Sequence, residues 1–286
     1  MRIGIFDSGL GGLSVLHCAR KMAPEHDYIF YADTEHVPYG EKTVEQVREY
    51  VDHIIKFMIS KGVDIIIIAC NTATSALSME YRKTFLIPIV GIEPAVKKAL
   101  DEYGNQEQRV LVAATPITIH GHKLEHLIQN LDHHHKVDLV AAPGLVRFAE
   151  NGIFSGKEVH EYLSTVLKEY DLEKVGTVVL GCTHFNYFKE SFIEIFPHRP
   201  HFVDGNEGTV RQAMRLMGYK NIDRNNCSRT FCYTDKENNE FAIECKKDYN
   251  QRRGMVTYLF SGKEASIEDM QKIDRCMTQL DKMMMV

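Results

Sequence analysis

The sequence has no hydrophobic run long enough to cross a membrane. Its longest apolar stretch, Ile65–Cys70, is far shorter than the roughly 20 residues that a spanning helix needs. Charge and glycine interrupt the first residues, Met1–Gly9, so we expect no signal peptide and a cytoplasmic location. The net charge of −5 comes without a basic stripe, which disfavours a nucleic-acid-binding protein. We therefore expect a soluble chain with neither nucleic acid nor membrane as a partner.

The sequence also lacks a disulfide framework and closely spaced cysteine pairs. Its seven cysteines are scattered along the chain at Cys18, Cys70, Cys182, Cys227, Cys232, Cys245 and Cys276. A chain without an export signal keeps its thiols reduced, so a disulfide scaffold is not expected. The question is then whether any of these free thiols carries chemistry.

Short apolar runs alternate with helical patterns, which predicts an α/β fold with parallel sheets. The predicted strands are Arg2–Phe6, Tyr28–Ala32, Val63–Ala69, Ile89–Ile92, Val110–Ala114, Val137–Ala141, Thr177–Leu180 and His201–Val203. A length of 286 residues suits two domains, and we place the break near Pro94–Gly104. We predict one domain from residues 1–94 with 207–286, to which the chain returns, and a second from 95–206.

A weak internal repeat is the most informative feature. Asp64–Thr72 and Gly176–His184 each read as an apolar strand, a small residue, a cysteine and two polar residues, with a helical pattern beyond. The two cysteines, Cys70 and Cys182, are 112 residues apart. Each should lie at the carboxyl end of a parallel strand, where ligands bind in open α/β sheets. A helix N-terminus there should lower the thiol pKa below its free value of about 8.5 and offer N–H groups to a carboxylate.

Two thiols, one from each half, suit racemisation, because one base removes an α-proton while an acid on the opposite face returns one. Three other interpretations remain open at this point. The cysteines fit buried small hydrophobes, or, together with His184, a metal site. They also fit a hydrolase that uses a single cysteine nucleophile.

The motif series resembles the cofactor-independent glutamate racemases. The matching segments follow in order over about residues 1–220: Gly4–Val15, Tyr31–Thr34, Val37–Gly40, Ala69–Thr74, Gly91–Ala95, Ala114–Pro116, Glu150–Gly152 and Leu180–His184. The resemblance implies two similar α/β domains with the active site in the cleft between them. It also implies interconversion of L- and D-glutamate for peptidoglycan synthesis without pyridoxal phosphate or metal, and a homodimer. Racemisation of another amino acid such as aspartate, or a non-catalytic binding protein of the same fold, is the alternative.

The resemblance also assigns roles to individual residues. Cys70 matches the thiol that deprotonates D-glutamate, and Cys182 the thiol that deprotonates L-glutamate. The polar residues that assist the thiols match Asp7, Glu150 and His184. The substrate-contact pairs match Asp7-Ser8, Tyr39-Gly40, Asn71-Thr72 and Thr183-His184.

The chain departs from the family pattern at three places. Arg147 stands where related sequences usually carry proline, close before Glu150. Phe185-Asn186 replaces the usual Tyr-Pro after His184. The chain from about residue 247 matches no motif of the series and is interpreted as a C-terminal extension. These departures affect the expected role of Glu150, the pocket shape and the subunit interface.

Overall fold

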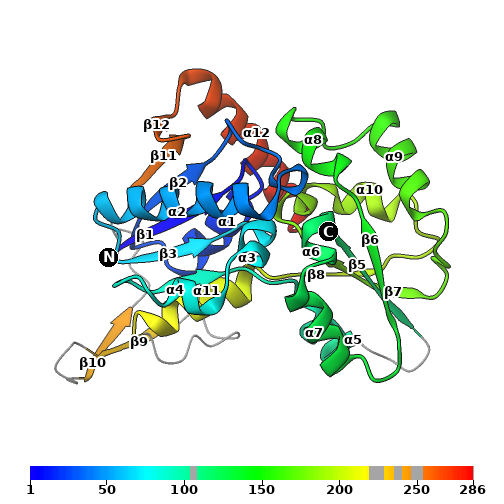
Figure 1. Cartoon of the computed structure of the whole chain (residues 1–286), viewed down its shortest axis with the longest axis horizontal. Helices are drawn as coiled ribbons and strands as arrows, with labels where there is room; N and C mark the ends of the chain where they lie inside the picture. Colours follow the sequence, from blue (N-terminus) through cyan, green and yellow to red (C-terminus); the bar gives the residue numbers. More distant parts are fainter. Residues whose placement is uncertain (104–107, 219–228, 235–239, 246–253, 286) are drawn as a thin grey trace.

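A computed structural model describes residues 1–103, 108–218, 229–234, 240–245 and 254–285. Within these residues the two larger sheets are flanked by helices, and the two halves that they form lie side by side (Figure 1). All eight predicted strands are present, with ends within two residues of the prediction. None of the described helices has the length and apolar character that a bilayer-spanning segment requires.

The first sheet has six strands in the order β12-β11-β2-β1-β3-β4. Its strands are β1 (Arg2–Asp7), β2 (Asp27–Ala32), β3 (Ile65–Ile68), β4 (Ile89–Gly91), β11 (Val256–Phe260) and β12 (Lys263–Glu264). Every pairing is parallel except that of β11 with β12.

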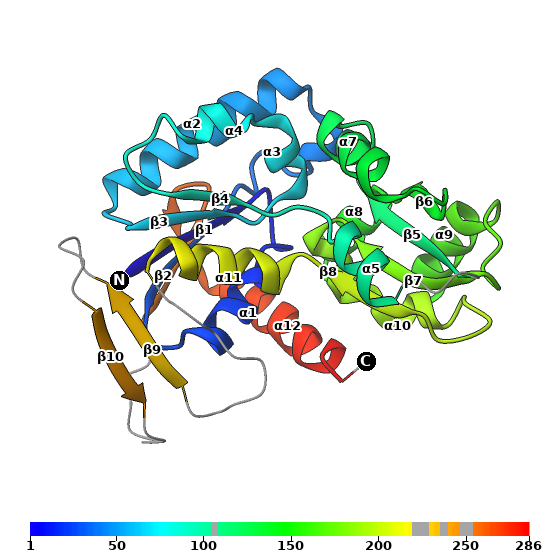
Figure 2. The same ribbon diagram turned by 90° about the horizontal axis from the view of Figure 1, so that it is seen from below.

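Helices cover both faces of this sheet, which explains the unbroken apolar run in β3. Ile65 and Ile67 pack in the cluster that contains α1 residues, whereas Ile66 and Ile68 pack with the apolar side chains of α2, as expected for a parallel strand buried on both sides. The helices of this half are α1 (Leu13–Met22), α2 (Val44–Ser60), α3 (Asn71–Ala76), α4 (Met79–Arg82), α11 (Asn206–Leu216) and α12 (Ile267–Met283). Figure 2 shows α2 on one side of the sheet and α1 with α11 and α12 on the other.

The second sheet has four parallel strands in the order β6-β5-β7-β8. These are β5 (Arg109–Ala114), β6 (Val137–Ala141), β7 (Val175–Leu180) and β8 (His201–Asp204). The α-helices around them are α5 (Val96–Tyr103), α6 (Pro116–Ile119), α7 (His122–Leu131), α8 (Gly144–Glu150), α9 (Lys157–Leu167) and α10 (Lys189–Ile193). Two short 3₁₀ helices complete the elements near the sheet edges, η1 (Tyr39–Glu41) and η2 (Thr183–Phe188). We propose that each sheet is the core of one domain, divided at the boundaries predicted above.

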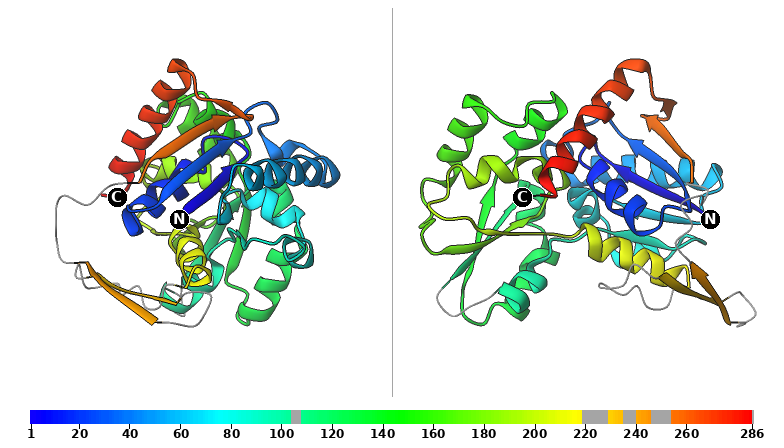
Figure 3. Two further views of the ribbon diagram at one scale, coloured as in Figure 1. Left: turned by 90° about the vertical axis from the view of Figure 1, so that its left-hand side faces the viewer. Right: turned by 180° about the vertical axis from the view of Figure 1, so that it is seen from behind.

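The end of the chain is part of the first sheet. Strand β11 pairs in parallel with β2, and the N-cap of α12 is Ser266, whose hydroxyl accepts from the Asp269 N–H. Helix α12 packs against α1 and η2, so it lies against both halves (Figure 3). Its Gln279 Nε2 donates to the Tyr187 carbonyl at 2.8 Å. The strand β11 was not predicted, because its short apolar run follows a long polar segment.

One further pair of strands, β9 (Arg229–Thr234) and β10 (Glu240–Cys245), forms a separate antiparallel sheet. Two charge-rich segments, 235–240 and 246–253, lie almost entirely outside the described residues, and Cys227 lies outside them as well.

Candidate active site

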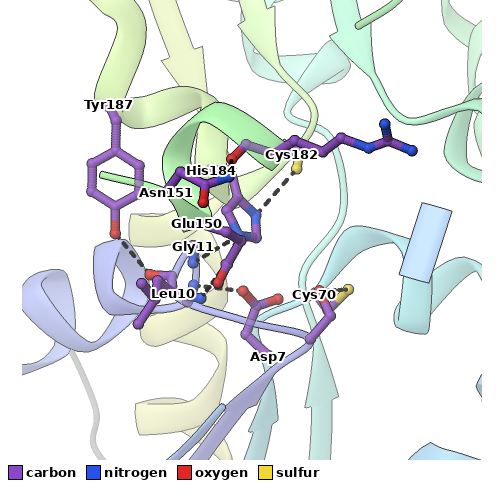
Figure 4. A network of polar contacts seen from close by, with 12 residues as sticks. Asp7, Leu10, Gly11, Cys70, Glu150, Asn151, Cys182, His184 and Tyr187 are labelled. Atoms are coloured by element: carbon purple, nitrogen blue, oxygen red, sulfur yellow. Dashed lines mark hydrogen bonds and ion pairs between the residues drawn. The ribbon is translucent and has the colours of Figure 1, made fainter. Parts of the chain in front are cut away.

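The carboxyl ends of strands from both sheets meet at one small cavity. Asp7 ends β1 and Ser8 follows it, while Cys70 comes after β3, Thr115 after β5 and Cys182 after β7. Figure 4 shows Asp7 and Cys70 on one side of the site, and Cys182 with His184 on the other. The cavity has a volume of about 10 Å³, which is enough for one water molecule. A larger substrate therefore requires the two walls to move apart.

The glycine-rich turn after β1 lets the second half approach closely. A Cβ at Gly9 would collide with the Glu150 carboxylate, and one at Gly11 would collide with the His184 ring. With only hydrogen at these positions, the Leu10 N–H donates to Glu150 Oε1 at 2.7 Å. The Tyr187 hydroxyl donates to the Leu10 carbonyl at 2.7 Å. Glu150 and His184 of the second half therefore pack directly against this turn.

Cys70 is the N-cap of α3 and is buried. Its Sγ accepts from the Ala73 N–H at 3.4 Å and, as a thiol, donates to Ser8 Oγ at 3.7 Å. Burial and the nearby Asp7 carboxylate raise the thiol pKa, and they outweigh the lowering effect of the Ala73 and Ser8 hydrogen bonds. The prediction that a helix N-terminus lowers this pKa is therefore wrong for Cys70 in the closed cavity, because desolvation disfavours the thiolate more than one N–H favours it.

Cys182 has a different partner, the imidazole of His184. The Cys182 Sγ lies 3.7 Å from His184 Nδ1, and His184 Nε2 lies 2.6 Å from Glu150 Oε1. Burial lowers the pKa of His184, but the hydrogen bonds and charges of Cys182 and Glu150 together raise it well above 6.5. His184 is then an imidazolium whose Nδ1–H donates to Cys182 and whose Nε2–H donates to Glu150. The Gly11 N–H lies 3.1 Å from His184 Nε2. In the imidazolium this nitrogen carries a hydrogen and has no free lone pair, so it cannot accept a hydrogen bond from Gly11.

Asp7 ends β1 between the two thiol systems and is almost fully buried. Burial raises its pKa to about 6, although the His184 charge and the Gly12 N–H oppose this shift. The Gly12 N–H donates to Asp7 Oδ2 at 2.8 Å. This carboxyl group is therefore able to exchange a proton near neutral pH.

Several polar groups lie on the rest of the cavity wall, beside the apolar side chains of Pro38, Pro143 and Val146. The Oδ1 atom of Asn71 is buried without a hydrogen-bond partner, an unusual state for a native side chain. The Thr72 and Thr115 hydroxyls lie 2.8 Å apart. The Tyr39-Gly40 wall is fixed because the Tyr39 hydroxyl donates to Asp33 Oδ2 at 2.6 Å, while the Asp33 N–H donates to the Asp7 carbonyl at 3.0 Å.

The structure brings nearly all of the predicted site residues together. The cavity wall contains Asp7, Ser8, Tyr39, Gly40, Cys70, Asn71, Thr72, Cys182, Thr183 and His184. Glu150 is not part of the wall and lies behind His184, with its Oε1 2.6 Å from His184 Nε2. The prediction missed Thr115, although Ala114–Pro116 was among the matched motifs; its place directly after β5 was the available signal. In the described part of the chain, no group of three or more His, Cys, Asp or Glu side chains is arranged to hold a metal ion.

Comparison with known proteins identifies the family. A family model described as "Asp/Glu/Hydantoin racemase" matches residues 14–213, which is well over half of the chain. The chain belongs to the aspartate/glutamate/hydantoin racemase family. As a member of a racemase family, the chain is an isomerase.

One relative matches almost the whole chain, and another matches most of it. The glutamate racemase of Lachnospira eligens is 43% identical over 284 residues, which are 99% of each chain. That of Campylobacter curvus is 48% identical over 226 residues, covering 78% of this chain and 85% of its own. The segment from about 247 therefore has a counterpart in a relative. The interpretation of this segment as an extension that matches nothing in the family was wrong.

Solved structures show the same racemase fold. The Campylobacter jejuni glutamate racemase superposes with a TM-score of 0.74 at 21% identity, covering 98% of both chains. The Aquifex pyrophilus glutamate racemase has a TM-score of 0.62 at 32% identity, covering 76% of this chain and 84% of its own. The predicted fold class, two parallel-sheet units flanked by helices, is confirmed, with β12 as an antiparallel addition.

Proposed function

We propose that this chain interconverts L- and D-glutamate by a two-base transfer of the α-proton, without a cofactor. The observation that carries the proposal is the meeting of Cys70 and Cys182, from different halves, in the wall of one cavity. The substrate is proposed from the relatives, since the glutamate racemases named above are up to 48% identical to this chain.

The two thiols have different polar neighbours, an imidazolium at Cys182 and a carboxyl group near Cys70. His184, held as an imidazolium by Glu150, stabilises a thiolate at Cys182. Cys70 stays a thiol because burial and Asp7 raise its pKa. In this state Cys182 takes the α-proton of L-glutamate: the Cα–H bond breaks and an S–H bond forms. Cys70 then gives its proton to the opposite face, which yields D-glutamate, and the roles reverse for D-glutamate.

The negative charge that develops on the substrate needs stabilisation by fixed groups. Hydroxyls and amides in a dry site act strongly on such charge because they are already oriented. We propose that Ser8, Thr72, Thr183 and the Gly40 backbone bind the substrate carboxylates. The buried Oδ1 of Asn71 is an acceptor for the substrate ammonium group.

The direct test is incubation of L-glutamate with the protein in deuterated water. We expect the optical rotation to fall to zero and deuterium to appear at Cα, because Cys70 exchanges its proton with solvent between turnovers. L-Aspartate in a parallel assay tests the alternative substrate. A stable rotation with L-glutamate, or faster racemisation of aspartate, would contradict the proposal.

Racemisation should depend on the ionisation of Asp7. Its raised pKa of about 6 means that the carboxyl group is protonated below this pH and is then unable to accept a proton from the Cys70 side. We expect kcat/KM to fall with a slope of one proton as the pH decreases through about 6. The Asp7→Asn variant should be slower at neutral pH and should lose this acidic limb. An unchanged limb in Asp7→Asn would assign the titration to another group.

We also propose the cellular setting that the resemblance implies. D-Glutamate from this reaction would be supplied for peptidoglycan synthesis, in the cytoplasm, by a homodimer. Sedimentation of the purified chain tests the dimer.

A further inference from the structure

An ion pair joins the two walls of the cavity on its solvent side. Glu41, the last residue of η1, is part of the wall and is its most exposed residue. Its Oε1 accepts from Arg147 Nε at 2.9 Å and from Nη2 at 2.6 Å. Arg147 lies on α8, next to Val146 of the cavity wall and one turn before Glu150. We call this pair of residues, Glu41 and Arg147, the rim pair.

The charges of the cavity wall indicate that the rim pair affects the binding of an anionic substrate. The wall contains the carboxylates of Asp7 and Glu41 and the buried His184 imidazolium, which is already paired with Glu150, but neither lysine nor arginine. A glutamate substrate carries two carboxylates and one ammonium group, and so has a net negative charge. Without its partner, the Glu41 carboxylate would repel such a substrate at the point of entry. The Arg147 guanidinium, which binds Glu41 Oε1 through Nε and Nη2, removes this repulsion.

If the rim pair had a purely structural role, its removal would change the stability of the protein only slightly. The side chains are 65% and 39% exposed, and ion pairs in such positions contribute about 0–1 kcal/mol to stability. Their interaction with an approaching ion is different, because it acts on substrate binding through the net charge at the rim. This difference makes the Michaelis constant, rather than stability, the informative measurement.

We propose that Arg147 is a specificity-determining residue that sets the affinity for a dicarboxylate by neutralising Glu41 at the rim of the cavity. The inference rests on the proposed glutamate racemisation. The rim carries no net charge in the wild-type chain, a negative charge in Arg147→Gln and a positive charge in Glu41→Gln. The double variant restores zero. KM for glutamate should be highest with the negative rim and lowest with the positive rim. The value of kcat should be the same in all variants, because neither residue touches the thiols.

The experiment measures kcat and KM for both enantiomers of glutamate in the wild type, the two single variants and the double variant. At about 0.01 M salt the screening length is about 30 Å, and we expect KM to rise about threefold to tenfold in Arg147→Gln. KM should fall in Glu41→Gln and return to within about twofold of wild type in the double variant. At about 1 M salt, where the screening length is about 3 Å, the differences should largely vanish. Lys157→Gln, which removes another exposed cation paired with Glu161 on α9, is the matched control and should leave KM unchanged.

Distinct results separate the failure of this inference from failure of the proposed function. If the wild-type chain racemises glutamate but Arg147→Gln has an unchanged KM at low salt, the rim role is wrong. If the double variant is as impaired as Arg147→Gln, the contact rather than the charge matters, and the inference is likewise overturned. Absence of racemisation by the wild-type chain itself would remove the proposed function and this inference with it.

Discussion

Replacement of either Cys70 or Cys182 by serine should reduce racemisation of glutamate at least about 10³-fold, within the range that a positioned acid or base contributes. A serine hydroxyl is a much weaker acid than a thiol, so it supplies neither the thiolate base at position 182 nor the ready proton at position 70. Both side chains are buried in the cavity wall, and oxygen is smaller than sulfur, so the fold should tolerate the change.

The measurement is the decay of optical rotation from both L- and D-glutamate. Because the two enantiomers have equal free energies, kcat/KM must fall equally in both directions, although kcat and KM separately need not. Cys18→Ser is the matched control: Cys18 is a half-buried free thiol on α1, next to Met22, and its replacement should leave the rate within about twofold. Retained racemisation in either cavity variant would falsify the two-base mechanism.

The second large effect is expected at His184. His184→Asn should lower kcat/KM about 10²-fold, because Cys182 loses the imidazolium that stabilises its thiolate and Glu150 loses its partner. Glu150→Gln should have a smaller effect, about tenfold, since the amide still accepts from the Leu10 N–H but carries no charge to keep His184 protonated. Its pH profile should shift, with His184 titrating at lower pH than in the wild type.

A surface histidine supplies the control for this variant. His135 is exposed and adopts a positive φ of 54°, a conformation that asparagine tolerates. His135→Asn should therefore retain both fold and rate. An unaltered kcat/KM in His184→Asn would show that Cys182 needs no imidazolium. An unaltered pH profile in Glu150→Gln would reduce Glu150 to a structural contact.

The local patterns predicted the elements of the fold well because the reasons for them are local. The apolar run of β3 has helices on both sides, so each isoleucine finds a core. The start of α2 is also specified locally, because Thr43 and Gln46 form a capping box with both of its hydrogen bonds in place. Strand β11 was missed since its short apolar sequence becomes a strand only by pairing with β2.

The sequence by itself indicated most of the residues that line the candidate site. The repeated strand-to-cysteine pattern placed Cys70 and Cys182 at strand ends, where parallel strands direct their following residues to one sheet edge. The motif series then indicated Asp7, His184 and the polar contact pairs, which the cavity wall contains.

Only the tertiary structure decided the state of each group. The raised pKa values of Cys70 and Asp7 arise from burial between two halves, and burial is a property of the packed molecule rather than of a motif. The contact of Glu150 with His184 and the Leu10 N–H, and that of Arg147 with Glu41, join residues at least 34 positions apart. No local pattern specifies such contacts, because they form only when both sheets dock on the glycine-rich turn.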